Sequence, residues 1–446
     1  MINEVEIRRR RDIRDVLTFT IDPIDAKDFD DAISFVKNED GTYQIGVHIA
    51  DVTHYVLPGD DVDKEAYEKA TSVYLVDKVL PMLPENLCND LCSLRPNEEK
   101  LCMSVIFTIT DDVCVKKAKI CRTVIRSDHR LSYEQAQQIL ESPSDGTPLS
   151  EALLKLNRMA HVLRQKRMAE GALDIEQDEV RFTLDEHKHP IDIYFVPSSD
   201  ANHLIEEFML LANRTVAEQM AKTGKTMVYR VHDKPDYEKL ESVNMFRKKM
   251  GDKVPQRMID LLTVRAMAKA VYSTHNIGHY GLAFDYYTHF TSPIRRYPDM
   301  MVHRIVAKYI LGERTPALNI DLQEACDHCS EMEQMAQMAE RDSIKEMQAI
   351  WIHDHLGEEY DGYISGVMEF GLFVTLNNSH CDGLVHIRSI RQGRWLDFDE
   401  KNCCLTMNGK PVYTLGDDVR VRVLRADAEK RQIDFELVED TETEQE

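Results

Sequence analysis

The chain has 446 residues, of which 43% are hydrophobic and 30% are charged, and its formal net charge is −23. This composition is typical of a soluble globular protein with two or three domains, and no apolar run is long enough for a membrane-spanning helix. The acidic total argues against non-specific nucleic-acid binding, although basic clusters at 116–119 and 295–296 leave room for a local phosphate-binding field. The ten cysteines are scattered and the N-terminus lacks an apolar signal segment. We therefore expect reduced thiols in a cytoplasmic protein.

After a charged lead-in at 1–16, five carboxylates fall within ten residues, namely Asp22, Asp25, Asp28, Asp30 and Asp31. Apolar runs at 17–21 and 32–36 flank them, which predicts an acidic turn between two strands of a core. Crowded carboxylates repel one another unless a cation lies between them, and oxygen ligands suit Mg²⁺. The segment therefore predicts a divalent-cation site. A solvated acidic loop is the alternative, and an EF-hand is disfavoured because its glycine and closing glutamate are missing.

Further along the chain, the pattern is strand-like to about residue 125 and mostly helical after about residue 131. Strands are predicted at 43–50, 72–75 and 101–107, a strand pair around 172–195, and helices at 150–169, 202–222, 256–275, 298–311 and 321–356. The last of these is one long helix or two joined ones. Its stripe of Met332, Met335 and Met338 is more typical of core packing than of a binding site.

Two segments carry residues suited to a nucleotide. Tyr74 could stack on a base, although a lone tyrosine more often packs within a core or hairpin. Residues 281–297 combine aromatic, hydroxyl and guanidinium groups, and Ser292-Pro293 indicates a turn or helix start. There, amide N–H groups and Arg295 could hold a phosphate. The alternative for this segment is a capped helix with surface arginines.

From residue 359 the pattern changes to short alternating strands separated by recurring glycines, which predicts a separate small β-barrel at 359–438, followed by an acidic tail at 439–446. Phe370 and Phe373 stand at a glycine turn, and His386 follows on a neighbouring strand. Exposed aromatics on one face of a small barrel form a platform for stacked bases. The alternative, two core phenylalanines, is weakened because Leu372 and Val374 already supply the alternate apolar face.

Taken together, these residues resemble the ribonuclease II/ribonuclease R family, with the ribonuclease R branch closer. The matching segments, in the family's order, are Thr20–Asp31, His48–Val52, Thr71–Tyr74, Pro81–Pro84, His279–Leu282, Thr291–Arg295 and Met338–Asp342. The resemblance implies an α+β protein, in which a mixed α/β catalytic (RNB-type) domain at 17–355 precedes an S1-type OB-fold barrel at 359–438. It also implies processive 3′→5′ hydrolysis of single-stranded RNA to nucleoside 5′-monophosphates, by a monomer in the cytoplasm.

The resemblance also assigns site residues. Mg²⁺, with Mn²⁺ as the alternative, would be held by Asp22, Asp28, Asp30 and Asp31, and Asp30 and Arg295 would be catalytic. RNA would be bound by Tyr74, Ile175, Glu206, Glu340, Phe370, Phe373, His386, Asp427 and Arg431. Glu206 and Glu340 taken alone would be solvated charges on helix faces, so their assignment depends on the resemblance.

The sequence departs from the family pattern in three places. It has neither the paired N-terminal cold-shock domains of the larger members nor a lysine-rich tail. Ile175 stands where an aromatic residue commonly clamps the terminal bases, and the segment between His232 and Met267 is shorter than usual. Two alternatives to the exoribonuclease therefore stay open. One is a catalytically weak or silent RNA-binding fragment, and the other is a phosphodiesterase restricted to short oligoribonucleotides.

Overall fold

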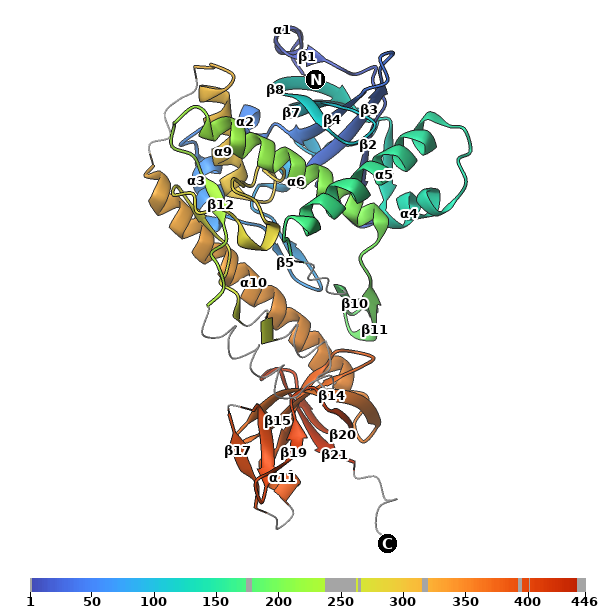
Figure 1. The fold of residues 1–446 in the computed structure, drawn as a ribbon, viewed down its shortest axis with the longest axis vertical. Coiled ribbons are helices and arrows are strands. Elements are labelled where there is room, and N and C mark those ends of the chain that lie inside the picture. The colour runs from blue at the N-terminus through green and yellow to red at the C-terminus, as the bar shows by residue number, and fades with distance from the viewer. Residues whose placement is uncertain are drawn as a thin grey trace.

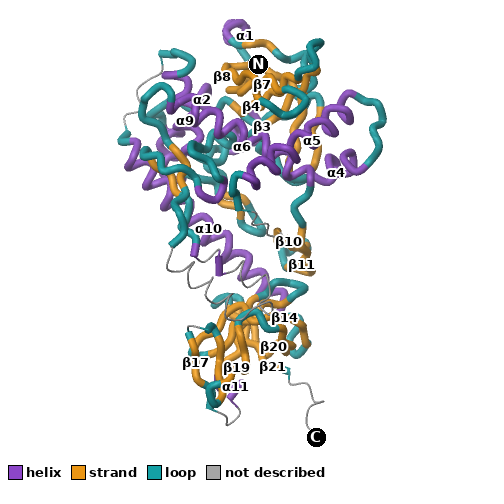
Figure 2. Tube along the Cα trace, in the orientation of Figure 1, coloured by secondary structure: helices purple, strands orange, loops and turns teal. Residues whose placement is uncertain are grey.

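The computed structural model describes residues 2–173, 179–236, 262–263, 266–314, 320–391, 395–400 and 402–438. A large mixed α/β region and a smaller barrel are joined by the long helix α10 (Leu322–His353), as Figure 1 shows. Figure 2 shows helices and strands mixed in the large region, and mainly strands in the barrel. The predicted α+β fold with an OB-type barrel is confirmed. Within the described residues, no helix combines the length and apolar character that crossing a membrane requires.

A seven-stranded sheet frames the large region, in the order β1-β8-β7-β4-β3-β2-β9. The outer pairs β1–β8 and β2–β9 are parallel, and the inner pairs are antiparallel. The strands are β1 (Arg11–Asp12), β2 (Thr18–Asp22), β3 (Asp31–Lys37), β4 (Tyr43–Ala50), β7 (Glu99–Ile109), β8 (Val115–Arg126) and β9 (His129–Ser132). Every residue of β2 is buried, so the carboxylates that follow it begin inside the core.

The lead-in at 1–16 is more integrated than the sequence indicates. It contains helix α1 (Glu4–Arg9) and the edge strand β1, which pairs with β8. Between them, the buried Arg10 forms an ion pair of 2.7 Å with the buried Asp51. The buried charge of Arg10 therefore holds helix α1 and strand β1 against the sheet. The sequence pattern alone does not predict that Arg10 is buried.

Helices cover the sheet and shape its surroundings. The predicted helices at 150–169, 202–222 and 298–311 correspond to α5 (Pro148–Ala169), α6 (Asp200–Ala221) and α9 (Tyr297–Tyr309). Ser199 caps α6 through a reciprocal capping box, which satisfies donors at its first turn. Shorter helices are α2 (Val52–Tyr55), α3 (Asp61–Lys69) and α4 (Tyr133–Glu141), with a π-helical turn at Leu87–Leu91.

Three two-stranded elements are separate from the main sheet. They pair β5 (Val73–Tyr74) with β6 (Val79–Leu80), β10 (Glu179–Leu184) with β11 (Pro190–Val196), and β12 (Tyr229–Val231) with β13 (Val271–Ser273). The strand pair expected around 172–195 is thus present. Part of the helix predicted at 256–275, residues 256–261 and 264–265, lies outside the described residues, and its end is wrong, because 271–273 is strand β13. Backbone pairing with β12 overrides the helical pattern there.

Helix α10 is a single helix of 32 residues. The prediction that its methionine stripe packs in the core is wrong for two of the three side chains, since Met335 is 59% and Met338 is 60% exposed. Met332 does pack against the main core. The reason is that α10 contacts β13 and α9 at one end and the barrel strand β20 at the other, and its middle bridges the two parts.

The barrel closes in the order β14-β15-β16-β21-β20. Its strands are β14 (Glu359–Met368), β15 (Gly371–Leu376), β16 (Asp382–His386), β20 (Asp418–Asp427) and β21 (Gln432–Leu437). Helix α11 (Ile387–Arg391) and a small sheet of β17 (Asp397–Asp399), β18 (Cys404–Met407) and β19 (Lys410–Thr414) are inserted between β16 and β20. Gly383 is required by packing, because a Cβ there would lie 2.3 Å from the Phe435 ring.

A buried histidine in the sheet gives a pH prediction. His48 is fully buried, with Nδ1 and Nε2 each 2.8 Å from the hydroxyls of Ser104 and Ser34, and burial lowers the pKa of His48 to about 3. The unfolded chain takes up this proton as the pH falls below about 6.5, whereas the folded chain does not. The free energy of unfolding is therefore unaffected by the titration of His48 above about pH 6.5, and it decreases progressively as the pH falls from there toward 3.

Lowering the pH from 7.5 to 5 should reduce the free energy of unfolding of both the unchanged protein and His48→Gln. We expect the reduction to be about 2 kcal/mol smaller in His48→Gln, because this variant lacks the titrating imidazole. Urea titrations of both proteins at the two pH values measure this difference. Equal losses in the two proteins would show that His48 does not titrate as its burial requires.

Candidate active site

The acidic segment forms a loop that connects β2 to β3. Asp22 is the last residue of β2 and Asp31 the first of β3, while Asp28 and Asp30 lie in the loop between them. The loop is held from outside: the Ser93 hydroxyl donates to the Lys27 carbonyl at 2.7 Å and accepts the Phe29 amide at 3.0 Å. The predicted strand, acidic turn and strand are therefore present.

Burial sets the electrostatics of these carboxylates. Asp22 and Asp30 are buried, and Asp31 is partly covered. Burial raises the pKa of Asp22 to about 7 and that of Asp31 to about 8, and their mutual repulsion adds to the shift at Asp31. Burial likewise raises the pKa of Asp30 well above its ordinary value, although the nearby Arg295 opposes the shift. Additional positive charge near these carboxylates would therefore stabilise their ionised forms.

The segment around Ser292-Pro293 reaches this cluster. The Ile294 amide donates to Asp30 Oδ1 at 2.8 Å, and Arg295 Nε lies 3.5 Å from Asp30 Oδ2. The residues after Pro293 form a turn, and α9 begins only at Tyr297. The expected use of this segment's amides for a phosphate is therefore wrong for Ile294, whose N–H is taken by a carboxylate. Arg295 is 44% exposed at its side chain and stays accessible.

The carboxylates fit a divalent cation in their chemistry. The buried oxygens Asp22 Oδ2 and Asp30 Oδ2 have no hydrogen-bond partner among the described residues, which is costly unless a cation or water supplies one. The set consists of hard oxygen donors, as Mg²⁺ and Mn²⁺ require. Across the described ranges, no three acidic, histidine or cysteine side chains already stand in metal-ligand geometry.

Tyr74 and Glu340 meet beside the acidic loop. Tyr74 lies on β5, its hydroxyl donates to Asp28 Oδ2 at 3.2 Å, and its backbone amide donates to Glu340 Oε1 at 3.0 Å. Both line a cavity of about 820 Å³ that also reaches Arg295. Tyr74 is 39% exposed, so its ring is available at the surface of the cavity. Glu340 has a positional role here, because one of its oxygens fixes the β5–β6 hairpin.

Of the other two predicted RNA contacts in the large region, the structure describes only Glu206. Glu206 lies on α6 and pairs with Arg167 at 3.2 Å, and it is not among the residues that line the cavity. Its neighbour Glu207 is buried against the same guanidinium. Ile175 lies outside the described residues.

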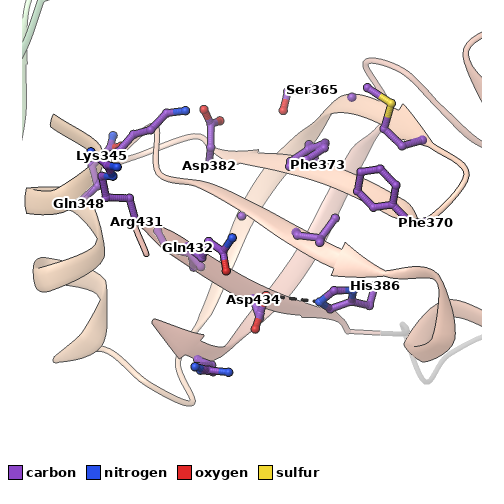
Figure 3. Close-up of a pocket in the computed structure, with 16 residues that line it drawn as sticks. Lys345, Gln348, Ser365, Phe370, Phe373, Asp382, His386, Arg431, Gln432 and Asp434 are labelled. Atoms are coloured by element: carbon purple, nitrogen blue, oxygen red, sulfur yellow. Dashed lines mark ion pairs between the residues drawn. The ribbon is translucent and has the colours of Figure 1, made fainter. Parts of the chain in front are cut away.

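The barrel carries a second cavity, of about 640 Å³, shown in Figure 3. Phe370, Phe373, His386 and Arg431 line it, and Asp427 does not. The two phenylalanine rings meet edge to face at 6.1 Å, and Phe370 is 53% exposed, so the alternative of two core phenylalanines is wrong for Phe370. His386 Nε2 lies 3.6 Å from Asp434, and Arg431 pairs with Asp342 of α10 at 2.7 Å.

Asp427 has a different local role. It accepts the Lys430 amide at 3.1 Å and pairs with Arg425 at 3.0 Å, which closes the turn between β20 and β21. Arg425 itself lines the barrel cavity, so Asp427 orients a cavity residue rather than facing the cavity.

Two residues that support the acidic loop were missed by the sequence reasoning. Ser93 holds the middle of the loop, as described above. Arg130, from β9, donates to the carbonyls of Pro23 and Ile24 at 2.7 and 2.8 Å and fixes its start. Neither residue carries a local signal, because each is separated from its partners by more than 60 positions of sequence.

Comparison with known proteins agrees with this architecture. The RNB domain model matches residues 10–312, and the S1 RNA binding domain model matches residues 354–437. Ribonucleases R of Aquifex aeolicus and Thermotoga maritima are each 38% identical over 473 residues, covering 98% and 99% of this chain. Because the alignments cover 66% of each relative, the chain spans slightly less than two thirds of their length.

Solved structures show the same arrangement. The structure of Mycoplasma genitalium RNase R in complex with ribose methylated single-stranded RNA matches with a TM-score of 0.91 at 27% identity, covering 98% of this chain and 73% of that one. Two domains of known type, in this order and at this coverage, define an RNB protein with an S1 barrel. The chain therefore belongs to the RNB family and is a homologue of ribonuclease R.

The fold by itself does not decide activity. Yeast Ssd1, described as a pseudonuclease, matches with a TM-score of 0.72 at 21% identity over 91% of this chain. The decision between an enzyme and a silent binding protein therefore depends on the residues of the site.

Proposed function

We propose that this chain is a Mg²⁺-dependent processive 3′→5′ exoribonuclease that hydrolyses single-stranded RNA to nucleoside 5′-monophosphates, with Mn²⁺ as an alternative cofactor. The observation that carries this proposal is the set of mutually repelling carboxylates, two of which have a buried oxygen without a hydrogen bond among the described residues, beside the accessible Arg295. Membership of the RNB family supports the reaction class, and the S1 barrel supports an RNA substrate.

Four residues of the loop would hold the cation, namely Asp22, Asp28, Asp30 and Asp31. A bound divalent cation neutralises the scissile phosphate and acidifies a water molecule for attack on phosphorus. Arg295, whose Nε lies 3.5 Å from Asp30 Oδ2, would stabilise the negative charge that develops on the phosphate oxygens beside these carboxylates. In this hydrolysis the new bond joins the water oxygen to phosphorus, the bond from phosphorus to the 3′ oxygen breaks, and that oxygen takes up a proton.

The remaining residues would hold the strand. Tyr74 stacks on a base near the 3′ end, where its hydroxyl bond to Asp28 aims the ring at the carboxylate cluster. Glu340 keeps the Tyr74 hairpin in place. In the barrel, Phe370, Phe373, His386 and Arg431 form the RNA platform, with Asp427 as a support. Ile175 and Glu206 stay proposals from the family resemblance alone.

The test is a 5′-labelled single-stranded RNA of about 30 nucleotides, incubated with Mg²⁺ and resolved on a denaturing gel. A ladder that shrinks from the 3′ end to a short stub, and that EDTA abolishes, supports the proposal. Intact RNA that nevertheless shifts on a native gel would replace it with the silent RNA-binding protein. Faster turnover of RNA of about five nucleotides than of the long RNA would instead favour the short-oligonucleotide phosphodiesterase.

Tyr74 gives a separate prediction about where degradation stops. Tyr74→Ala is expected to lengthen the final stub by roughly one or two nucleotides, because a base loses its stacking partner. Tyr74→Phe keeps the ring and loses only the hydroxyl bond to Asp28, so its stub should match that of the unchanged protein. The same gel measures both variants. An unaltered stub in Tyr74→Ala would mean that the terminal base is held elsewhere.

A further inference from the structure

The hairpin β10–β11 presents two different faces. Because alternate strand residues point to opposite sides of a strand pair, Phe182 and its cross-strand partner Ile193 share one side. That side is apolar and packs into the same hydrophobic cluster as the barrel core. Arg181 and its partner Tyr194 share the other side. Figure 1 shows the hairpin between the large region and the barrel.

The second face of the hairpin belongs to the site. Arg181 and Tyr194 line the same cavity of about 820 Å³ as Tyr74 and Arg295, and atoms of Val180 and Phe182 on the apolar side reach its edge as well. Tyr194 is 43% exposed, and the Arg181 side chain is 28% exposed. An exposed ring and a partly covered guanidinium therefore lie side by side on paired strands, at the wall of the cavity that Tyr74 also lines.

The guanidinium of Arg181 is incompletely satisfied. Its contacts to Glu179 are 3.3 Å from Nε and 3.4 Å from an Nη atom, which are long for charge-assisted hydrogen bonds. Its buried Nε has no partner that meets hydrogen-bond geometry among the described residues. Arginine donates through a planar fork that suits phosphate oxygens. The Arg181 side chain is 28% exposed, so a phosphate in the cavity would contact the exposed part of this fork and not the buried Nε.

We propose that Arg181 and Tyr194 form an additional nucleotide subsite, in which the Tyr194 ring stacks on a base and Arg181 holds the adjoining phosphate. This inference rests on the proposed function. The bond to be cleaved lies beside the 3′ end at the carboxylate cluster, and the subsite lies outside that cluster. Its ligand is therefore a ribonucleotide on the 5′ side of the cleaved bond.

The position of this subsite is tied to the barrel. On the opposite face of the hairpin, the centroid of the Phe195 ring lies 4.1 Å from that of the His380 ring in the barrel. At the hairpin's tip, His189 Nε2 lies 2.8 Å from Asp354 Oδ2, just after α10. The hairpin thus contacts both parts of the chain. An RNA strand that passes from the barrel toward the carboxylates would cross the subsite on its way.

The test measures binding without cleavage. In the full chain carrying Asp30→Asn, the Kd of a 5′-fluorescein oligouridine of about 12 nucleotides is measured by fluorescence anisotropy over a series of KCl concentrations. Arg181→Glu is expected to raise Kd about 10-fold or more and to lower the slope of log Kd against log salt by about 1. Tyr194→Ala is expected to raise Kd at least about 5-fold, with little change in slope.

Conservative variants separate binding from structure. Arg181→Lys keeps the charge and Tyr194→Phe keeps the ring, so both should stay within about threefold of the parent. Glu179→Gln, which releases the guanidinium, should tighten binding about twofold. Matched controls are Arg158→Glu, an exposed residue of α5 that lines neither cavity, and Ile191→Ala, which is 59% exposed on β11.

The outcomes distinguish this inference from the proposed function. An unchanged Kd and salt slope in Arg181→Glu would overturn the subsite, as would equal losses in Arg181→Glu and Arg181→Lys, which indicate a structural pair with Glu179. If the protein without Asp30→Asn fails to cleave RNA but its Kd still depends on Arg181 and Tyr194, the exoribonuclease is wrong and the subsite stands. In an active enzyme, Arg181→Glu should raise KM and leave kcat within about twofold.

Discussion

Asp30→Asn is expected to reduce RNA cleavage by roughly 10³-fold or more, as loss of a charged group aimed at the transition state does. The substitution changes little in shape: the amide oxygen can still accept the Ile294 N–H that now bonds Asp30 Oδ1 at 2.8 Å. What disappears is the negative charge that faces Arg295 and that would hold the cation. Single-turnover cleavage of labelled RNA measures the effect.

RNA affinity and folding serve as internal controls for this variant. Tyr74 and the barrel platform are untouched, so the Kd for RNA should stay within about threefold. Burial raises the pKa of Asp30 well above its ordinary value, so in the metal-free protein this carboxyl costs stability above the ordinary carboxyl pKa, and Asp30→Asn should leave the melting temperature at pH 8 equal or higher. Asp15→Asn, the same change at a fully exposed carboxylate, should leave cleavage unaltered. Cleavage by Asp30→Asn near the unchanged rate would refute the site.

The second large effect concerns folding. Asp51 is fully buried and pairs with Arg10 at 2.7 Å and with Arg122, which in turn pairs with Glu313 at 2.7 Å. Burial alone would raise the pKa of Asp51, but the charges of Arg122 and Arg10 outweigh it and hold the pKa well below its ordinary range. Since the pKa is depressed, this stabilisation is present at neutral pH and is lost only in strong acid.

Asp51→Ala should therefore destabilise the large region by about 3–5 kcal/mol, because it removes the carboxylate shared by the buried guanidinium of Arg10 and the partly buried guanidinium of Arg122. Urea unfolding at pH 7.5 measures the change. Asp12→Ala removes an exposed carboxylate that pairs with Arg14 at 2.6 Å, and it should cost at most about 1 kcal/mol. Similar losses in the two variants would contradict the role assigned to burial.

The sequence predicted those features that depend on residues close together in the chain. The acidic turn between two strands followed from the run of carboxylates between apolar segments, and the barrel followed from alternating strands at regular glycines. Helix α10 was expected as one element or two, and it is one. The family assignment followed from the order of several such local motifs, and the matches to the RNB and S1 models confirm it.

Where neighbours came from distant segments, local patterns failed. The methionine stripe was assigned to the core because its spacing is helical, yet Met335 and Met338 are exposed where α10 bridges two bodies. A helical pattern was extended to residue 275, although β12 supplies backbone partners to 271–273. For the Ser292-Pro293 segment, one of the two predictions placed its amides on a phosphate, although a carboxylate takes the Ile294 amide.

By itself, then, the sequence determined the carboxylates of the loop, the strands on either side of them and the barrel, because hydrophobic periodicity and charge density are local properties of a chain. Only the tertiary structure shows that the Ile294 amide donates to Asp30, which lies 264 positions earlier in the chain, and that Arg295 pairs with the same carboxylate. It alone also decided that Arg181 and Tyr194 line the same cavity as Tyr74 and Arg295. The physical reason is that long-range contacts follow from how buried faces pack together, which no single segment encodes.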